Sequence, residues 1–207
     1  MSILRVGAAL AVAYLLGSIL AGPLVARWFG GDLRAAGSGN PGATNALRLF
    51  GRKAGVLVFG FDFAKGLIAG LWIPLWLAPS AIGWLPPLTV LAAVLGHLYP
   101  VFSRFRGGKG VATFLGGVLA IAPPLFVLVA LAWAIAFYVT GYVVVASLSG
   151  ALAFAVVSWI WPGSWPQALI GGFGTLLFLI LIWTHRANLK RLHEGVEHRF
   201  KTAWRAG

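Results

Sequence analysis

The longest uncharged stretch of the chain, Val111 to Thr184, strongly limits the folds that are available to it. Two further apolar runs cover Ile3 to Ala26 and Ala54 to Ala78. Each of the three regions contains at least one segment close to the roughly 20 residues that an α-helix needs to cross a bilayer. Only 10% of the 207 residues are charged, whereas a soluble domain averages roughly 25%. We therefore predict an all-α integral membrane protein, with one polytopic domain over residues 1–207.

The positions of the cationic residues predict the orientation of the chain. Almost every Lys and Arg falls in one of three islands, Arg27–Lys53, Arg104–Lys109 and Arg186–Arg205. The positive-inside rule places such islands in the cytoplasm. Because the larger cationic cluster follows the first apolar run, that run is expected to be a retained span with its N-terminus outside, and not a cleaved signal peptide.

Turn-forming residues divide the apolar stretches into seven expected transmembrane helices, with the C-terminus in the cytoplasm. The breakers are, in chain order, Pro79, Pro86-Pro87, Pro123-Pro124, Gly141 and residues 161–164. The segment Val111 to Ala122 has only about 12 residues, fewer than the roughly 17 of a full span. We expect it to be a short or tilted helix that is buried among its neighbours.

Composition also limits the possible partners and cofactors. A net charge of +12 could attract nucleic acid, but little of this chain is exposed to form a basic stripe, so membrane lipid explains the charge better. The chain has no cysteine and only four acidic residues. These counts exclude a disulfide framework and a thiol nucleophile, and they argue against a multi-carboxylate Mg²⁺ site. We expect neither a metal nor a cofactor.

Residues 37–45, here called the first glycine loop, are rich in glycines and hydrogen-bond donors. The pattern Gly37-x-Gly39-x-x-Gly42 matches the dinucleotide fingerprint, but it lies between two spans and not within a βαβ unit, so that interpretation fails. A general anion-binding loop remains, with flexible cytoplasmic turns as the alternative. The predicted binding residues are Gly37, Ser38, Gly39, Asn40, Gly42, Thr44, Asn45 and Arg48.

Residues 107–110, the second glycine loop, place Lys109 where an apolar helix begins, among Gly107, Gly108 and Gly110. A helix N-terminus carries partial positive charge and unsatisfied N–H groups, so an added Lys suits a phosphate. The alternative is that Lys109 is only a topology signal. Two anion sites on one membrane face suggest two substrates that carry phosphate.

Five other polar side chains are candidates near or within the spans. His185 and Asn188 share one helix face at the cytoplasmic boundary, where Asn188 can hold a polyol hydroxyl. His97 is expected to be a helix-end partner for backbone carbonyls. Asp62 and Lys65 are spaced to pair within one span, either as a functional site or as a structural brace that orients the first glycine loop.

Three blocks of residues, in order along nearly the whole chain, give it a specific resemblance to a known family. The blocks are Gly37–Asn45 with Arg48, Gly51 and Asp62-x-x-Lys65-Gly66; Gly96-His97-x-x-Pro100 with Phe105-x-Gly107-Gly108-Lys109-Gly110-Val111-Ala112-Thr113; and His185-Arg186-x-Asn188-x-x-Arg191-Leu192-x-x-Gly195-x-Glu197. They resemble the bacterial glycerol-3-phosphate acyltransferases that use acyl phosphate, the PlsY family. The resemblance implies a seven-span inner-membrane enzyme with its active site at the cytoplasmic face. Its reaction would move a fatty acyl group from acyl phosphate to the 1-hydroxyl of sn-glycerol 3-phosphate, giving lysophosphatidic acid and phosphate.

The resemblance also implies roles for individual residues. Ser38 and His185 correspond to catalytic positions, and Arg48, Lys109 and Asn188 to substrate-binding ones. Ser147 is the best match to a serine that the family uses at the inner end of the sixth span, although Gly141 and Val144 stand where many relatives have Arg and Ser. The enzyme that produces acyl phosphate is a candidate partner.

The mechanism that we expect is direct attack of the glycerol hydroxyl on the acyl-phosphate carbonyl, aided by positioning and charge neutralisation. The base is either His185 or a substrate phosphate. An alternative function is a membrane carrier or channel for an organic phosphate. It predicts polar residues through the depth of several spans, and apart from Asp62 and Lys65 few are present.

Overall fold

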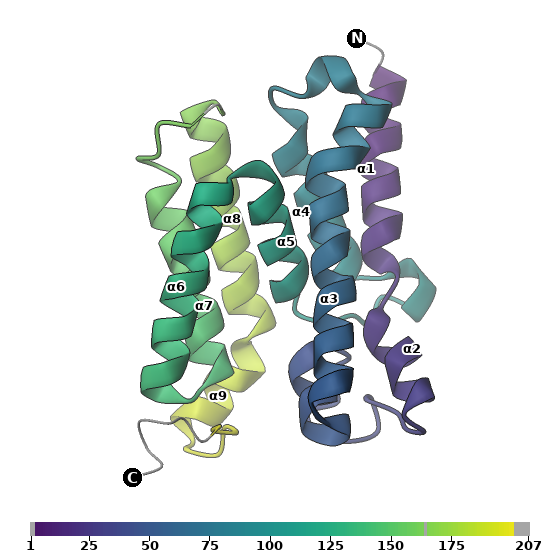
Figure 1. Cartoon of the computed structure of the whole chain (residues 1–207), viewed down its shortest axis with the longest axis vertical. Helices are drawn as coiled ribbons and strands as arrows, with labels where there is room; N and C mark the ends of the chain where they lie inside the picture. The colour runs from purple at the N-terminus through teal and green to yellow at the C-terminus, as the bar shows by residue number, and fades with distance from the viewer. Residues whose placement is uncertain (1–2, 164, 201–207) are drawn as a thin grey trace. The chain divides into compact units, whose positions relative to one another are not determined.

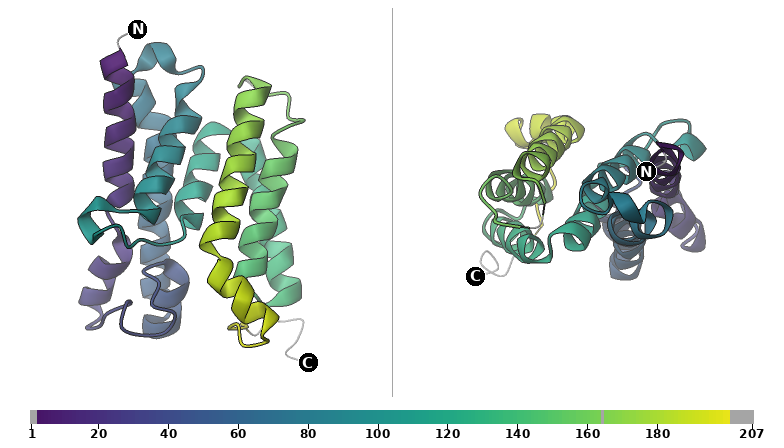
Figure 2. Two further views of the ribbon diagram at one scale, coloured as in Figure 1. Left: turned by 180° about the vertical axis from the view of Figure 1, so that it is seen from behind. Right: turned by 90° about the horizontal axis from the view of Figure 1, so that it is seen from above.

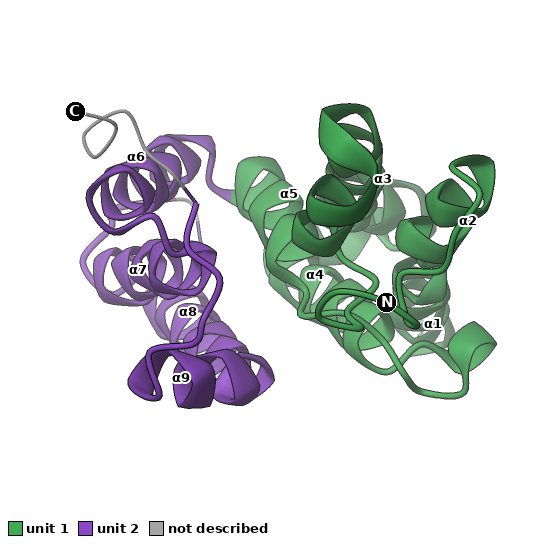
Figure 3. Cartoon of the chain, turned by 90° about the horizontal axis from the view of Figure 1, so that it is seen from below, with its two compact units in different colours: residues 1–121 green, residues 122–207 purple. Residues whose placement is uncertain are grey.

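The computed structural model describes residues 3–163 and 165–200, and these residues form helices joined by turns and loops. They divide into two compact units, of which unit 1 ends at Ile121 and unit 2 begins at Ala122 (Figure 3). Ser164 of the expected turn at residues 161–164 lies outside the described residues, as does the end of the third cationic island, residues 201–205.

Unit 1 contains the first five α-helices (Figure 1). They are α1 (Ile3–Ser18), α2 (Ala21–Trp28), α3 (Ala43–Leu77), α4 (Leu85–Leu98) and α5 (Val111–Ile121), with 3₁₀ turns η1 (Pro79–Ala81) and η2 (Val101–Ser103). Prolines at the first positions of α4 suit a helix start because those N–H groups have no intrahelical partner. Gly51, at a φ of 82°, interrupts α3, so a short helical segment after the first glycine loop precedes the long apolar part.

Glycines allow the closest helix contacts in unit 1. Gly66 and Gly116 lie between α3 and α5, and Gly17 and Gly96 lie between α1 and α4. A Cβ atom at any of these four positions would overlap backbone atoms of the facing helix. Small residues at such crossings are typical of membrane helices, where close van der Waals packing replaces the hydrophobic effect as the source of association.

Unit 2 contains the remaining helices, and α7 packs against both α6 and α8 (Figures 1 and 2). The helices are α6 (Pro123–Thr140), α7 (Val143–Val157), α8 (Gln167–Thr184) and α9 (Arg186–His193). Gly141 ends α6 in the left-handed conformation, with a φ of 75°, and its N–H donates to the carbonyl of Phe137. The predicted breaks at Pro123-Pro124 and Gly141 are therefore confirmed.

Among the residues that the structure describes, five helical segments are long and apolar enough to cross a membrane. They are Ile3–Trp28, Ala43–Leu77, Leu85–Ser103, Pro123–Thr140 and Gln167–Thr184. The short helix expected after Lys109 is α5, whose 11 residues rise only about 17 Å at about 1.5 Å per residue, against a hydrocarbon core of about 30 Å. With α5 and the 15-residue α7, the described part of the chain has seven apolar segments, and seven full spans remain a prediction.

Candidate active site

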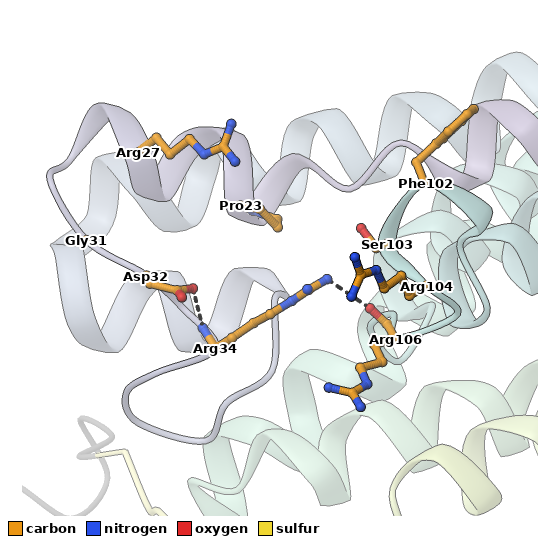
Figure 4. A pocket seen from close by; sticks show the side chains of 9 residues that line it. All are labelled: Pro23, Arg27, Gly31, Asp32, Arg34, Phe102, Ser103, Arg104 and Arg106. Carbon is orange, nitrogen blue, oxygen red and sulfur yellow. Dashed lines mark hydrogen bonds between the residues drawn. The ribbon is translucent and has the colours of Figure 1, made fainter.

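The first two cationic islands lie at the same end of unit 1. Nη2 of Arg34 donates a hydrogen bond to the backbone oxygen of Arg106, at 3.1 Å. A cavity of about 650 Å³ lies beside this contact, lined by Arg27, Arg34, Arg104 and Arg106 and by a single acid, Asp32 (Figure 4). Four guanidinium groups against one carboxylate give this end of unit 1 a positive potential that attracts anions.

Asn45 fixes the shape of the first glycine loop. Its side chain is 2% exposed, and Oδ1 accepts the N–H of Ser38 at 3.0 Å. Its Nδ2 donates to the carbonyls of Leu33 and Ala36 at 3.0 and 3.2 Å. Asn45 therefore holds the loop that displays the exposed Ser38, and its role as a direct substrate ligand remains a prediction.

The first glycine loop does not offer a row of backbone amides to an anion, as its composition suggested. The N–H of Ser38 donates to Asn45, that of Gly39 to the carbonyl of Ala36, and that of Gly42 to Oδ1 of Asn40. Gly37 and Gly39 adopt positive φ values of 61° and 68°, so glycine is needed at these two positions to form the turn. Ligand contacts by Ser38, Thr44 and Arg48 remain predictions.

The second glycine loop packs against the end of α4. The N–H of Gly108 donates to the carbonyl of His97 at 3.0 Å, so this amide is also used within unit 1. A Cβ atom on Gly107 would overlap the His97 carbonyl, and one on Gly108 would overlap the His97 ring. Gly110, with a φ of 83°, leads directly into α5. The half-buried Lys109 therefore stands next to the N-terminus of a helix, as predicted.

The predicted pairing of Asp62 with Lys65 is confirmed, since Nζ lies 2.9 Å from Oδ1. The sequence predicted that the His97 ring would bind backbone carbonyls at a helix end. Among the described residues, the ring instead contacts Lys65. Its Nδ1 lies 3.1 Å from Nζ of Lys65. The cluster of Asp62, Lys65 and His97 thus reaches the second glycine loop through His97, and its role as a brace for the first glycine loop remains a prediction.

In unit 2, His185 ends α8 with a side chain that is only 2% exposed. Its Nδ1 lies 2.8 Å from the carbonyl oxygen of Leu181. Because a carbonyl can only accept, the ring proton belongs on Nδ1, and Nε2 of the neutral ring carries the lone pair. This tautomer is the one in which Nε2 can accept a proton.

Asn188 lies in α9, one helical turn after His185, and is held by an acid that sequence reasoning did not assign to the site. Nδ2 of Asn188 donates to Oε1 of Glu197 at 2.9 Å, while Nε of Arg191 donates to Oε2 at 2.7 Å. The orientation of the Asn188 amide is therefore set by Glu197, and contact of Asn188 with a substrate hydroxyl remains a prediction.

A helix-ending turn brings Glu197 back to α9. The N–H of Gly195 donates to the carbonyl of Leu192, and the N–H of Val196 donates to that of Arg191. Together with the φ of 73° at Gly195, these bonds form a Schellman motif. Gly195 soon after a cationic helical segment was the sequence signal for this return of the chain.

Ser147 lies in the second turn of α7 and is 4% exposed. The turn that precedes α7 is held from the C-terminal side of unit 2, because Nε of Arg199 donates to the carbonyl of Thr140 at 2.9 Å. The N–H of Phe200 donates to the carbonyl of Gly141 at 2.9 Å. The structure therefore places Ser147 near the end of unit 2 that carries the third cationic island, and a substrate contact remains a prediction.

Apolar spans and cationic islands at helix ends define the class: the chain is an integral membrane protein with polar groups gathered at the ends of its helices. The chain belongs to the glycerol-3-phosphate acyltransferase family, whose model matches residues 7–195. This match covers helices of both units and identifies the protein as an enzyme of the PlsY type.

Relatives named glycerol-3-phosphate acyltransferase match over nearly their whole length. The Aquifex aeolicus protein is 42% identical over 191 residues, covering 91% of this chain and 95% of the relative. The Thermus thermophilus protein is 44% identical over 194 residues, covering 92% of each chain.

Two crystal structures of PlsY (YgiH), described as an integral membrane glycerol 3-phosphate acyltransferase, share this fold. The glycerol 3-phosphate form gives a TM-score of 0.85 at 40% identity, covering 95% of this chain and 96% of that one. The lysophosphatidic acid form gives a TM-score of 0.84 with the same identity and coverage.

Proposed function

We propose that the chain transfers a fatty acyl group from acyl phosphate to the 1-hydroxyl of sn-glycerol 3-phosphate, giving lysophosphatidic acid and inorganic phosphate. The observation that carries this proposal is the 40% identity, over 95% of the chain, to a PlsY solved in its glycerol 3-phosphate and lysophosphatidic acid forms. The family assignment favours this enzyme over the carrier that composition also allowed.

In unit 1 the proposed roles are the binding and neutralisation of phosphate. Lys109 and Arg48 supply full positive charges, and the N-termini of α3 and α5 add oriented amide dipoles. The hydroxyl of Ser38, on a loop fixed by Asn45, is placed to hold the acyl-phosphate donor. Charge neutralisation makes phosphate a better leaving group and therefore lowers the barrier to acyl transfer.

In unit 2 the proposed roles concern the acceptor. Oδ1 of Asn188 accepts from a glycerol hydroxyl, and the 1-hydroxyl oxygen forms a bond to the acyl carbon while the bond from that carbon to the phosphate oxygen breaks. The hydroxyl proton goes either to Nε2 of His185 or to a substrate phosphate. The tautomer of His185 set by Leu181 supports the first route.

We place the reaction at the cytoplasmic face of the bacterial inner membrane, in a seven-span chain. The supporting observation is that the first two cationic islands meet at one end of unit 1. In unit 2, the third island lies at the same end as the turn between α6 and α7. The positive-inside rule assigns such ends to the cytoplasm.

The test is acyl transfer by the purified protein in phospholipid nanodiscs, with radiolabelled glycerol 3-phosphate and either acyl phosphate or acyl-CoA. We expect labelled lysophosphatidic acid with acyl phosphate and little with acyl-CoA. Within residues 3–163 and 165–200, only loops connect the helices, and they offer little surface for docking a larger carrier. Comparable turnover with acyl-CoA would contradict the donor assignment, and labelled glycerol 3-phosphate crossing vesicles without product would support a carrier.

A further inference from the structure

In the described part of unit 1, three ionisable side chains that the proposed reaction does not use are buried. Asp62, Lys65 and His97 are 2%, 5% and 4% exposed, and they come from α3 and α4. Ionisable groups inside a membrane protein are costly unless they meet a partner, so their presence calls for an explanation. Here Nζ of Lys65 contacts both Oδ1 of Asp62 and Nδ1 of His97, at 2.9 and 3.1 Å.

Part of the explanation is structural and involves only Lys65 and its counter-ion. The helix between Ile3 and Trp28 breaks after Ser18, which leaves backbone carbonyls without intrahelical donors. Nζ of Lys65 donates to the carbonyls of Gly17 and Ile19 at 3.0 and 2.8 Å. The ammonium therefore closes the break between α1 and α2, and Asp62 balances its charge. This task does not require a histidine.

His97 extends the cluster toward the second glycine loop. Nδ1 of His97 lies 3.1 Å from Nζ of Lys65 and 3.6 Å from Oδ1 of Asp62, so the ion pair holds this edge of the ring. The Nε2 edge of the ring faces Gly108, where even a methyl group would overlap it. The backbone oxygen of the same histidine accepts the N–H of Gly108. The ring and the carbonyl of His97 thus both contact Gly108, the residue before Lys109.

We propose that His97, oriented by Lys65 and Asp62, is a positioning residue that sets the geometry of the second glycine loop and thereby aims Lys109 and the N-terminus of α5 at a phosphate. The functional part of this inference rests on the proposed acyl transfer. Preorganised charge is effective only when it is held in place, and a displacement of about 1 Å can cost about a hundredfold in rate. Three partners fix the His97 ring: Lys65, Gly108 and the helix that carries it.

A double-mutant cycle between His97 and Lys109 tests the proposal. His97→Ala should lower kcat/KM by about ten- to a hundredfold at equal folded protein, mostly in kcat. In the Lys109→Ala background the same change should cost no more than about two- to threefold, because the charge that His97 positions is already absent. Equal losses in both backgrounds would overturn the proposal.

Two further variants separate positioning from a general loss of stability. Thr89→Val is the matched control, because Thr89 is also a fully buried polar residue of α4 and donates to the carbonyl of Pro86 within its own helix. It should keep wild-type kcat/KM. His97→Asn keeps an acceptor near Lys65 but loses the ring edge against Gly108. It serves as the folded substitute if His97→Ala does not fold, and it should show the same dependence on Lys109.

Amide hydrogen exchange provides a readout that does not depend on catalysis. His97→Ala leaves the carbonyl that binds Gly108 in place, yet exchange at residues 106–110 should accelerate because the ring no longer supports the loop. Thr89→Val should leave that exchange unchanged. Unchanged exchange in both His97 variants would overturn the positioning role. Absence of acyl transfer by the wild type would instead contradict the proposed function, and exchange alone would then decide this inference.

Discussion

Glu197 holds the side-chain amide of Asn188, with Oε1 of the carboxylate 2.9 Å from Nδ2 of the amide. Both side chains are buried, with exposures of 8% and 7%. The second carboxylate oxygen binds Arg191 at 2.7 Å, so the acid is fixed on both sides. An acid that orients an amide in this way determines which atom of Asn188 faces a substrate hydroxyl.

Glu197→Ala should therefore act through Asn188. We expect kcat/KM to fall by about tenfold or more, because a charged hydrogen bond contributes about 1.5–3 kcal/mol. In the Asn188→Ala background the further loss should be small. Glu194→Gln is the control, since Glu194 is exposed and meets Lys190 only at 3.8 Å. Activity per folded protein measured in nanodiscs checks both; equal effects at Glu194 and Glu197 would contradict the assignment.

We expect acyl transfer to be independent of metal ions, because the acidic side chains are engaged within the protein. Each of the four acidic side chains already has a partner within the chain. The pairs are Asp32 with the N–H of Arg34, Asp62 with Lys65, Glu194 with Lys190, and Glu197 with Asn188 and Arg191. Such acids are poor ligands for Mg²⁺, which prefers free carboxylates and phosphate oxygens. Acyl transfer should be unchanged by EDTA, and loss of activity that Mg²⁺ restores would argue against this prediction.

The arginine-lined cavity of unit 1 should affect encounter with substrate more than chemistry. In Arg27→Gln/Arg104→Gln we expect a severalfold higher KM for glycerol 3-phosphate and little change in kcat, because the positive potential is reduced away from the reacting atoms. The difference from the wild type should shrink as salt rises to about 0.5 M, where charges are strongly screened. A kcat loss that is insensitive to salt would place these arginines in the reaction itself.

The topology can be measured directly. Reporter fusions after Gly207 and in the loops near Arg34 and Arg106 should all report the cytoplasm. The contact between Arg34 and Arg106 already requires the latter two loops to agree, because they meet at one end of unit 1. An external signal from the C-terminal fusion would mean that residues 111–185 cross the membrane an odd number of times, and α5 or α7 would then not be a full span.

Local signals in the sequence predicted what local physics determines. Helix ends at Pro123 and Gly141 follow from the restricted backbone of proline and the left-handed conformation open to glycine. The spacing of Asp62 and Lys65 predicted their ion pair because residues three apart are neighbours on a helix surface. In each case the interacting atoms are within a few residues of one another.

Contacts between distant residues could not be predicted in this way. His97 joins Lys65 from 32 positions away. The amides of the first glycine loop are used within the loop, that of Ser38 by Asn45, that of Gly39 by Ala36 and that of Gly42 by Asn40. Composition indicated anion binding but not which amides remain for a ligand. The division of the helices into two compact units likewise depends on packing that no single motif records.

Lys109 is the most direct test of the phosphate site. If its ammonium pairs with a phosphate that the N-terminus of α5 alone does not neutralise, Lys109→Ala should lose roughly 1.5–3 kcal/mol of binding in the transition state, which is about ten- to a hundredfold or more in kcat/KM. Lys109→Arg should restore only part of the activity, because a planar guanidinium must fit where Gly108 and Gly110 pack closely against α4.

A residue that serves only as a topology signal would tolerate both changes, since cationic groups at Arg104 and Arg106 remain in the same island. Steady-state kinetics of both variants at equal folded protein, with reporter fusions to verify orientation, distinguish the two roles: wild-type kcat/KM in Lys109→Ala would remove Lys109 from the site.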